Sequence, residues 1–193
     1  MTDWKAIWDR KGKEDTTDLK QLDGFEKTSI DMKKVAEFII GRMEIKPSHR
    51  VLELGCGAGF LAQHIAPHCK YIGVDMTESL IKKHIKLLGN SVLLAEADDI
   101  PFKDNYFDMS ISYSVFHYFP DKEYFNKVMK ELLRVTKRRI FIGDLPLESN
   151  DISHLLYALS DFRSYSVIAT NKGCSNKNRF SIMVDIGVKD GIN

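Results

Sequence analysis

The sequence predicts an α/β fold: a doubly wound, mostly parallel sheet of seven strands that ends in an antiparallel hairpin. Short apolar runs alternate with segments of helical periodicity through most of the 193 residues. Strands and helices that alternate in this way form a parallel sheet whose right-handed crossovers cover both faces. The last two apolar runs are joined by a turn-rich loop, residues 171–176, which favours an antiparallel pair.

Each element follows from a local pattern. Met32, Val35, Ala36, Ile39 and Ile40 recur at helical spacing, whereas the run 51–54 is apolar throughout and stops at a glycine, as a buried strand does. The expected helices are 32–40, 60–66, 77–88, 121–135 and 152–159. The expected strands are 51–54, 71–74, 92–95, 107–112, 139–143, 165–170 and 179–186.

The composition excludes several classes of protein. Lys and Arg number 28 against 27 Asp and Glu, a net charge of +1, so nucleic acid is an unlikely partner. Three cysteines without a C-x-x-C pair argue against a disulfide framework and a structural zinc site, and we expect no metal. No signal peptide and no run of 18 apolar residues is visible, so we expect a cytoplasmic protein without a membrane span.

Three alternating glycines follow the first expected strand. Gly55, Gly57 and Gly59 occupy the strand-to-helix turn where open α/β sheets bind ligands, although a tight turn built for packing is the alternative. The spacing is G-x-G-x-G, and Phe60 stands where a dinucleotide fingerprint has its last glycine. Glu53, just before the turn, suits an ammonium group better than a pyrophosphate.

The segment 51–59, which reads VLELGCGAG, resembles motif I of the class I S-adenosylmethionine-dependent methyltransferases. The closest likeness is to the small-molecule type, such as the quinone-biosynthesis methyltransferases. This resemblance implies a Rossmann-like fold, S-adenosylmethionine as cofactor and S-adenosylhomocysteine as product. It also implies that the backbone of Gly55, Cys56 and Gly57 lies against the methionine part of the cofactor, which Glu53 helps to orient.

Two further segments extend the nucleoside site. Asp75 ends the second strand, twenty residues after Gly55, where a carboxylate can accept both ribose hydroxyls; its alternative is a helix cap beside Thr77. Met76 follows and can pack on adenine or in the core.

The segment 95–102, AEADDIPF, resembles the family's stretch after the third strand. That likeness puts Glu96 at the acidic position and Ala97 at the backbone donor beside adenine. Asp98 is the alternative to Glu96 for the contact with the adenine amino group. A further alternative is that both are carboxylates exposed in a loop, without a role in binding. The segment 105–119 resembles the family's fourth strand and the loop after it, which places the backbone near Ser112 and Tyr113 at the methionine end.

The sequence contains fewer signals for the methyl acceptor than for the cofactor. The D/N-P-P-Y motif of amino-methyltransferases and the Pro-Cys nucleophile of cytosine C5 enzymes are absent after the fourth strand, which favours O- or N-methylation of a small molecule. An RNA-directed enzyme, a non-catalytic cofactor-binding module and a nicotinamide oxidoreductase are the alternatives. His117 is the candidate general base, or else a packing histidine; Asp144 can line the acceptor pocket or cap a loop.

We expect one domain over residues 1–193. Residues 1–46 form a helical cap or lid, 47–145 the cofactor-binding core, and 146–193 a final helix and strands. Trp4 and Trp8 are four residues apart and share one face of a short helix, which covers the cofactor or simply docks. The expected partner is a small-molecule acceptor, with the protein a monomer or a homodimer.

Overall fold

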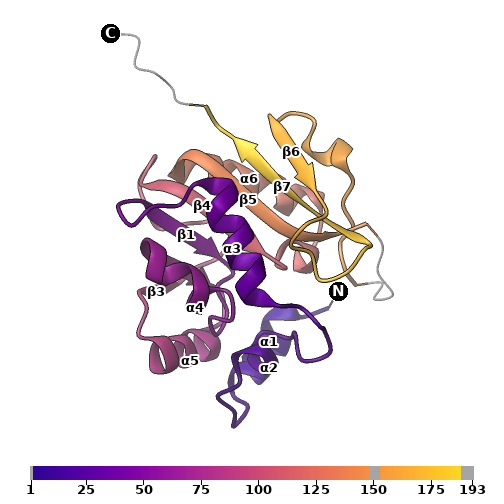
Figure 1. Ribbon diagram of the computed structural model, residues 1–193. Coiled ribbons are helices and arrows are strands. Elements are labelled where there is room, and N and C mark those ends of the chain that lie inside the picture. Colours follow the sequence, from indigo (N-terminus) through magenta and orange to yellow (C-terminus); the bar gives the residue numbers. More distant parts are fainter. Residues whose placement is uncertain (1, 148–152, 188–193) are drawn as a thin grey trace.

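A computed structural model describes residues 2–147 and 153–187 and contains one seven-stranded sheet in the order β3-β2-β1-β4-β5-β7-β6 (Figure 1). Strands β1 to β5 pair in parallel, and β7 runs antiparallel to both β5 and β6. The predicted fold class is therefore confirmed. The strands are β1 (Arg50–Leu54), β2 (Lys70–Asp75), β3 (Val92–Leu94), β4 (Phe107–Tyr113), β5 (Thr136–Pro146), β6 (Val167–Thr170) and β7 (Arg179–Asp185).

The helices begin where capping side chains stand. Asp31 accepts a hydrogen bond from the backbone N–H of Lys34 at the start of α3, and Asp121 accepts one from that of Tyr124 at the start of α6. The α-helices are α1 (Trp4–Gly12), α2 (Leu19–Leu22), α3 (Met32–Met43), α4 (Ala62–Ile65), α5 (Glu78–Leu88) and α6 (Lys122–Val135). The short 3₁₀ turns are η1 (Ala66–His68), η2 (Phe116–Tyr118) and η3 (Leu159–Phe162).

Both faces of the sheet are buried. Along β1, Val51 packs into the cluster beneath α3 and α4, whereas its neighbour Leu52 packs into the cluster beneath α6. Figure 1 shows α3 and α6 on opposite sides of the sheet. Side chains that alternate between two apolar layers explain why the strands read as nearly continuous apolar runs.

The predicted helix over 152–159 is wrong for the part that the structure describes. Residue 152 lies outside the described residues, residues 153–158 are irregular, and only the η3 turn begins at Leu159. The backbone N–H of Leu155 donates to the carbonyl of His117 and that of Tyr157 to the carbonyl of Pro146, at 2.9 and 3.0 Å. Because these amides bond to other segments, no helical ladder forms there.

The N-terminal segment packs beside α5, next to the carboxyl ends of the strands (Figure 1). The Ser79 hydroxyl donates to the carbonyl of Asp9, and the Lys83 ammonium donates to the carbonyls of Glu14 and Thr16. The sheet order reverses between β1 and β4, so the segment lies near the position where open α/β sheets bind ligands. Among the described helices, none is long and apolar enough to span a membrane.

Candidate cofactor and acceptor site

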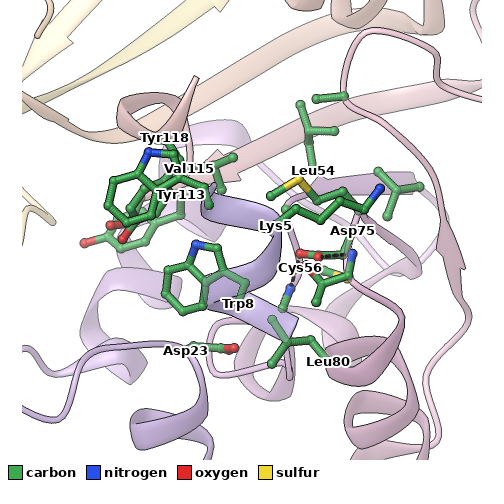
Figure 2. A pocket seen from close by; sticks show the side chains of 18 of the residues that line it. Lys5, Trp8, Asp23, Leu54, Cys56, Asp75, Leu80, Tyr113, Val115 and Tyr118 are labelled. Atoms are coloured by element: carbon green, nitrogen blue, oxygen red, sulfur yellow. Dashed lines mark hydrogen bonds between the residues drawn. The ribbon is translucent and has the colours of Figure 1, made fainter. Parts of the chain in front are cut away.

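A cavity of about 290 Å³ opens at the carboxyl ends of β1, β2 and β4 (Figure 2). The α1 helix lies across it and contributes Trp4, Lys5 and Trp8 to the wall. The rest of the wall comes from the turn after β1, the end of β2, the loop after β3 and the loop after β4. Segments that are distant in the sequence thus meet at the switch point of the sheet.

The glycine turn, residues 55–59, adopts a backbone that side chains resist. Gly55, Gly57 and Gly59 have φ values of 73°, 50° and 104°. A Cβ atom on Gly55 would collide with the side chain of Val115, and one on Gly57 with the carboxylate of Asp23. The turn therefore needs glycine both for its conformation and for the close approach of neighbouring groups.

Asp23 holds this turn from the N-terminal segment. Its carboxylate accepts hydrogen bonds from the backbone N–H groups of Ala58, Gly59 and Phe60 at 2.7, 3.1 and 2.8 Å. Burial raises the pKa of Asp23 to about 7, against the opposing effect of these amides. Sequence reasoning missed Asp23, since no spacing rule links an Asp-Gly pair in a polar stretch to a turn 35 residues further on.

Two more carboxylates face the cavity from adjacent strands. Glu53 is 4% exposed and accepts a 2.8 Å hydrogen bond from the Tyr71 hydroxyl, and burial raises its pKa to about 8. Asp75 accepts hydrogen bonds from the backbone N–H groups of Gly57 and Thr77, and burial raises its pKa as well. Burial disfavours the charged forms of Asp23, Glu53 and Asp75, and a bound cation would offset that cost at each of them.

Seven predicted site residues line the cavity together: Glu53, Gly55, Cys56, Gly57, Asp75, Met76 and Ala97. Cys56 is buried, and burial raises the pKa of its thiol well above the usual value, so the thiol stays protonated. The backbone N–H of Cys56 donates to the carbonyl of Val74, which fixes the turn against β2.

Four predicted site residues lie outside the cavity wall. Ser112 turns its hydroxyl to the carbonyl of Leu54, at 3.1 Å. Glu96 points outward and forms an exposed ion pair with the Lys5 ammonium, at 2.6 Å. The Asp98 carboxylate lies beside the hydroxyl of Tyr124, and it is Tyr124 that reaches the wall.

His117 is the fourth of these residues. Its side chain is 2% exposed and packs between the rings of Tyr118 and His154, with centroids 4.0 and 4.7 Å away. Burial, with Arg179 and His154 nearby, lowers the pKa of His117 well below its usual value. Its Nδ1 has no hydrogen-bond partner within the described part of the chain. The imidazole is therefore neutral and stands behind Tyr118, which itself lines the cavity.

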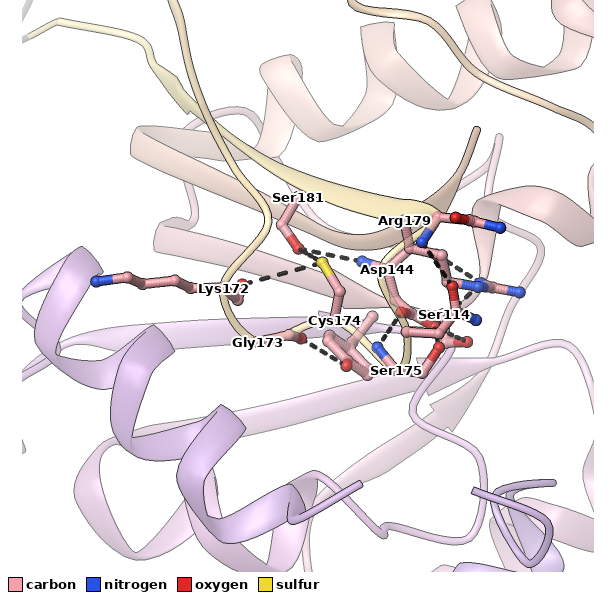
Figure 3. A network of polar contacts seen from close by, with 11 residues as sticks. Ser114, Asp144, Lys172, Gly173, Cys174, Ser175, Arg179 and Ser181 are labelled. Atoms are coloured by element: carbon pink, nitrogen blue, oxygen red, sulfur yellow. Dashed lines mark hydrogen bonds and ion pairs between the residues drawn. The ribbon is translucent and has the colours of Figure 1, made fainter. Parts of the chain in front are cut away.

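Asp144 caps a loop and does not line the cavity (Figure 3). It is 1% exposed, and its carboxylate accepts hydrogen bonds from the Ser114 hydroxyl, the Ser175 backbone N–H and the Arg179 guanidinium at 3.0, 2.6 and 3.0 Å. Ser114 and Asp144 both have left-handed backbone, with φ values of 58° and 64°. This network ties the β6–β7 loop to the cavity wall at Ser114.

Three aromatic rings form a cluster on the wall, the aromatic cluster of Trp4, Trp8 and Tyr118. The Tyr118 ring centroid lies 4.6 Å from that of Trp4 and 5.3 Å from that of Trp8.

The described residues contain no group of three or more His, Cys, Asp or Glu side chains that could hold a metal ion.

Comparisons with known proteins give matches over the middle of the chain. Residues 52–141 match the family model described as a methyltransferase domain. A tRNA (carboxymethyluridine(34)-5-O)-methyltransferase of Arabidopsis thaliana is 36% identical over 111 residues, which are 56% of this chain and 26% of that protein. A ubiquinone/menaquinone biosynthesis C-methyltransferase of Cupriavidus pinatubonensis is 35% identical over 81 residues, 37% of this chain and 33% of that protein. The chain thus spans about a third or less of these two relatives.

Solved structures share the fold. Phosphoethanolamine N-methyltransferase 1 of Haemonchus contortus superposes with a TM-score of 0.69 at 12% identity, over 94% of this chain and 48% of that one. An S-adenosylmethionine-dependent methyltransferase of Clostridium acetobutylicum superposes with a TM-score of 0.67 at 14% identity, over 82% of this chain and 93% of that one. These two likenesses, at 12% and 14% identity, show the fold alone, whereas residues 52–141 are similar to a methyltransferase domain, in agreement with the family that the motifs of this chain resemble.

Proposed function

We propose that this chain transfers the methyl group of S-adenosylmethionine to a nitrogen or oxygen atom of a small-molecule acceptor. The observation that supports this most is the junction of the glycine turn with the carboxylates of Glu53 and Asp75 on one cavity. S-adenosylmethionine carries a sulfonium, an ammonium and a ribose diol. The cavity offers acceptors for those groups and an apolar remainder for the base.

The residues present fit this cofactor. Glycines 55 and 57 leave room where a Cβ atom would meet Val115 or Asp23, so only a glycine backbone is compatible with this turn. Burial raises the pKa values of Glu53 and Asp23, to about 8 and about 7, and a cationic ligand would offset that cost. The second observation favours a cationic nucleoside over an anionic dinucleotide.

Each side chain then has a proposed role. The backbone at Gly55, Cys56 and Gly57 lies against the methionine part, and Glu53 accepts from its ammonium. Asp75 accepts from the ribose hydroxyls with the lone pairs that Gly57 and Thr77 leave available.

Adenine packs on Met76 beside the backbone of Ala97, while Glu96 and Asp98 shape the loop around it. Ser112 acts from behind the wall, because its hydroxyl holds the last carbonyl of β1. Residues 1–46 close the site as a cap through Trp4, Lys5, Trp8 and Asp23.

When bound, S-adenosylmethionine supplies an electrophilic methyl group. The acceptor lone pair forms a bond to the methyl carbon as the carbon–sulfur bond breaks, sulfur keeps the electron pair, and any N–H or O–H proton of the acceptor passes to solvent. The chain contributes mainly orientation and exclusion of water. His117, neutral and packed against Tyr118, is proposed to position that ring.

An RNA acceptor is the second candidate, since the Arabidopsis relative is named for tRNA. A net charge of only +1 supplies little attraction for phosphates, and the carboxylates that line the cavity disfavour them, so a small molecule is favoured. The test is transfer of a tritiated methyl group to separate panels of amines, alcohols, phenols, carboxylic acids and tRNA, with Asp75→Ala as the inactive control. We expect label in one small-molecule panel. Label in tRNA alone would overturn the acceptor class, and binding of S-adenosylhomocysteine without label in any panel would favour a non-catalytic module.

A further inference from the structure

The two tryptophans of this chain, Trp4 and Trp8, both lie in the cavity wall. With Tyr118 they form the aromatic cluster, and all three side chains are half-buried, so part of each ring faces the cavity. Trp8 meets the ring of Tyr118 at an interplanar angle of 75° and Trp4 meets it at 57°. Rings set at such angles present faces in different directions around a shared space.

Tyr118 of the aromatic cluster lies on the β4 side of the glycine turn, whereas Trp8 also packs against the apolar cluster of Leu22, Ala58 and Leu80 beside that turn. Tyr118 ends the η2 turn that follows β4, and Val115 in the same loop packs on Gly55. Asp75 and Ala97, proposed for the nucleoside, come from the ends of β2 and β3 on the other side of β1. Figure 2 shows Trp8 between Asp23 and the group of Tyr113, Val115 and Tyr118. The position of Tyr118 therefore favours the acceptor over adenine as the group beside this ring.

The charge on the wall has one dominant sign. Four carboxylates line the cavity in the described part of the chain: Asp3, Asp23, Glu53 and Asp75. Lys5 is the cation on that wall, and its ammonium is paired with Glu96. Neither arginine nor histidine is found among the described residues of the wall. Because burial raises the pKa values of Asp23, Glu53 and Asp75, the wall gains negative charge when a cation enters it, and an aromatic surface beside such groups attracts cations.

From this placement we propose that the acceptor is an organic amine whose nitrogen sits against the faces of Trp4, Trp8 and Tyr118. The proposal rests on the proposed function and names its substrate class. The lone pair of the neutral amine forms the new nitrogen–carbon bond, the carbon–sulfur bond breaks, and positive charge moves from sulfur to nitrogen. The rings stabilise that charge as it develops, which is where catalysis gains most. The product ammonium then loses any N–H proton to solvent.

An oxygen acceptor fits the wall less well, because an alcohol or phenol must lose its proton as it attacks. The wall carboxylates already accept hydrogen bonds from the protein: Asp3 from Ala6, Asp23 from the glycine turn, Glu53 from Tyr71, and Asp75 from Gly57 and Thr77. His117 is buried behind Tyr118. An amine that reaches the wall in its neutral form attacks with a free lone pair and keeps its N–H protons until the product ammonium has formed, so this form needs no positioned base on the wall.

The test compares two probes of nearly equal shape. Choline carries a quaternary ammonium, and 3,3-dimethylbutan-1-ol is its neutral isostere. Each is titrated into the protein saturated with S-adenosylhomocysteine, and the fluorescence of Trp4 and Trp8 reports binding directly. We expect choline to bind about tenfold or more tightly than the isostere, as cation–π contacts in a desolvated site allow. Equal affinities, or tighter binding of the neutral probe, would overturn the proposal.

Variants locate the effect. Trp8→Phe keeps an aromatic face and should keep most of the choline preference, whereas Trp8→Leu and Tyr118→Leu should lose it. Tyr165→Leu, which removes an aromatic ring outside the cavity wall, is the matched control and should leave the preference unchanged. If Tyr165→Leu abolished the preference as fully as Trp8→Leu, the site would not be the aromatic cluster.

Titration of S-adenosylhomocysteine alone separates this inference from the proposed function. Its failure to bind would count against the proposed function itself. Binding of S-adenosylhomocysteine without a preference for choline would overturn only the proposal that the acceptor is an amine.

Discussion

The carboxylate of Asp23 accepts a 2.7 Å hydrogen bond from the backbone N–H of Ala58, which joins the N-terminal segment to the glycine turn. Gly59 and Phe60 donate to the same carboxylate, so it satisfies three amides at the start of the segment that leads into α4. Free amides at such a turn ordinarily attract an anion. Here Asp23 supplies it, so the shape of the cavity depends on how the N-terminal segment docks.

Asp23→Ala should therefore weaken binding of S-adenosylhomocysteine. Removal of charge-assisted hydrogen bonds costs about 1.5–3 kcal/mol, so we expect a loss of about 10-fold or more in affinity by calorimetry, with a smaller loss for Asp23→Asn. Asp31→Ala is the matched control, because Asp31 caps α3 in the same way but does not line the cavity. Equal affinities for Asp23→Ala and Asp31→Ala would show that the turn holds its shape without Asp23.

Binding should release protons near neutral pH. The pKa values of Asp23 and Glu53 stand at about 7 and about 8 in the free protein, above their ordinary values near 4. The ammonium group of S-adenosylhomocysteine, which lacks the sulfonium charge of the methyl donor, favours the charged carboxylates, so binding lowers both pKa values and expels protons. Affinity for S-adenosylhomocysteine should then weaken as the pH falls below about 8, by about tenfold between pH 8 and pH 6.

The free protein should show the opposite dependence. A carboxyl whose pKa is raised by folding contributes stability below its unfolded pKa, and this contribution is lost as the pH rises through the folded pKa. The free energy of unfolding attributable to Asp23 and Glu53 should fall between about pH 4 and pH 8.

Calorimetry in buffers of different ionisation enthalpy measures the protons that are released when S-adenosylhomocysteine binds, and Glu53→Gln should reduce their number. An unchanged proton count in Glu53→Gln would refute the assignment.

Asp75→Ala should weaken the binding of S-adenosylhomocysteine, because the variant loses the proposed contact with ribose. A hydrogen bond to a charged acceptor contributes about 1.5–3 kcal/mol, so the loss of two corresponds to about a 100-fold or larger change in Kd. Its partners Gly57 and Thr77 also lose an acceptor, so the variant's thermal stability must be recorded beside the affinity. Adenine, which lacks ribose, should compete equally for wild type and variant. If Asp75→Ala bound S-adenosylhomocysteine as tightly as wild type, the ribose role would be wrong.

The buried Asp144–Arg179 pair should be important for stability. Asp144 is 1% exposed and the Arg179 side chain 13%, so Asp144→Asn leaves a poorly solvated guanidinium without its counter-ion. Breaking a buried pair costs about 3–5 kcal/mol, which urea denaturation measures directly. Glu78→Gln removes the partner of Lys82 from a pair whose side chains are 65% and 71% exposed, and should cost under about 1 kcal/mol. Similar losses in the two variants would mean that the network in Figure 3 contributes no more than a surface pair.

The fold was predictable because its signals are local. Apolar runs such as 51–54, the periodicity of α3, and the turn-rich link between β6 and β7 each report one element, and their order sets the sheet. The error over 153–158 has a physical source: the backbone N–H groups of Leu155 and Tyr157 donate to the carbonyls of His117 and Pro146 and not to a helical ladder. Tertiary partners of this kind leave no periodic trace.

The site was predictable in part for the same reason. Glu53 and Asp75 lie at the carboxyl ends of β1 and β2, and the glycines follow β1, so strand ends located them. Asp23 and the aromatic cluster depend on how the N-terminal segment docks, which spacing along the chain does not encode. His117 looked like a base from its residue type alone, whereas its burial behind Tyr118 is a property of three-dimensional packing.

Calorimetric titration of wild-type protein with S-adenosylhomocysteine, set against the same titration with NAD and NADP, tests the central claim most directly. We expect one S-adenosylhomocysteine to bind per chain, with protons released at pH 7, and no heat of binding from either dinucleotide. Binding of a dinucleotide in place of S-adenosylhomocysteine would contradict the cofactor assignment and every role proposed for Glu53 and Asp75.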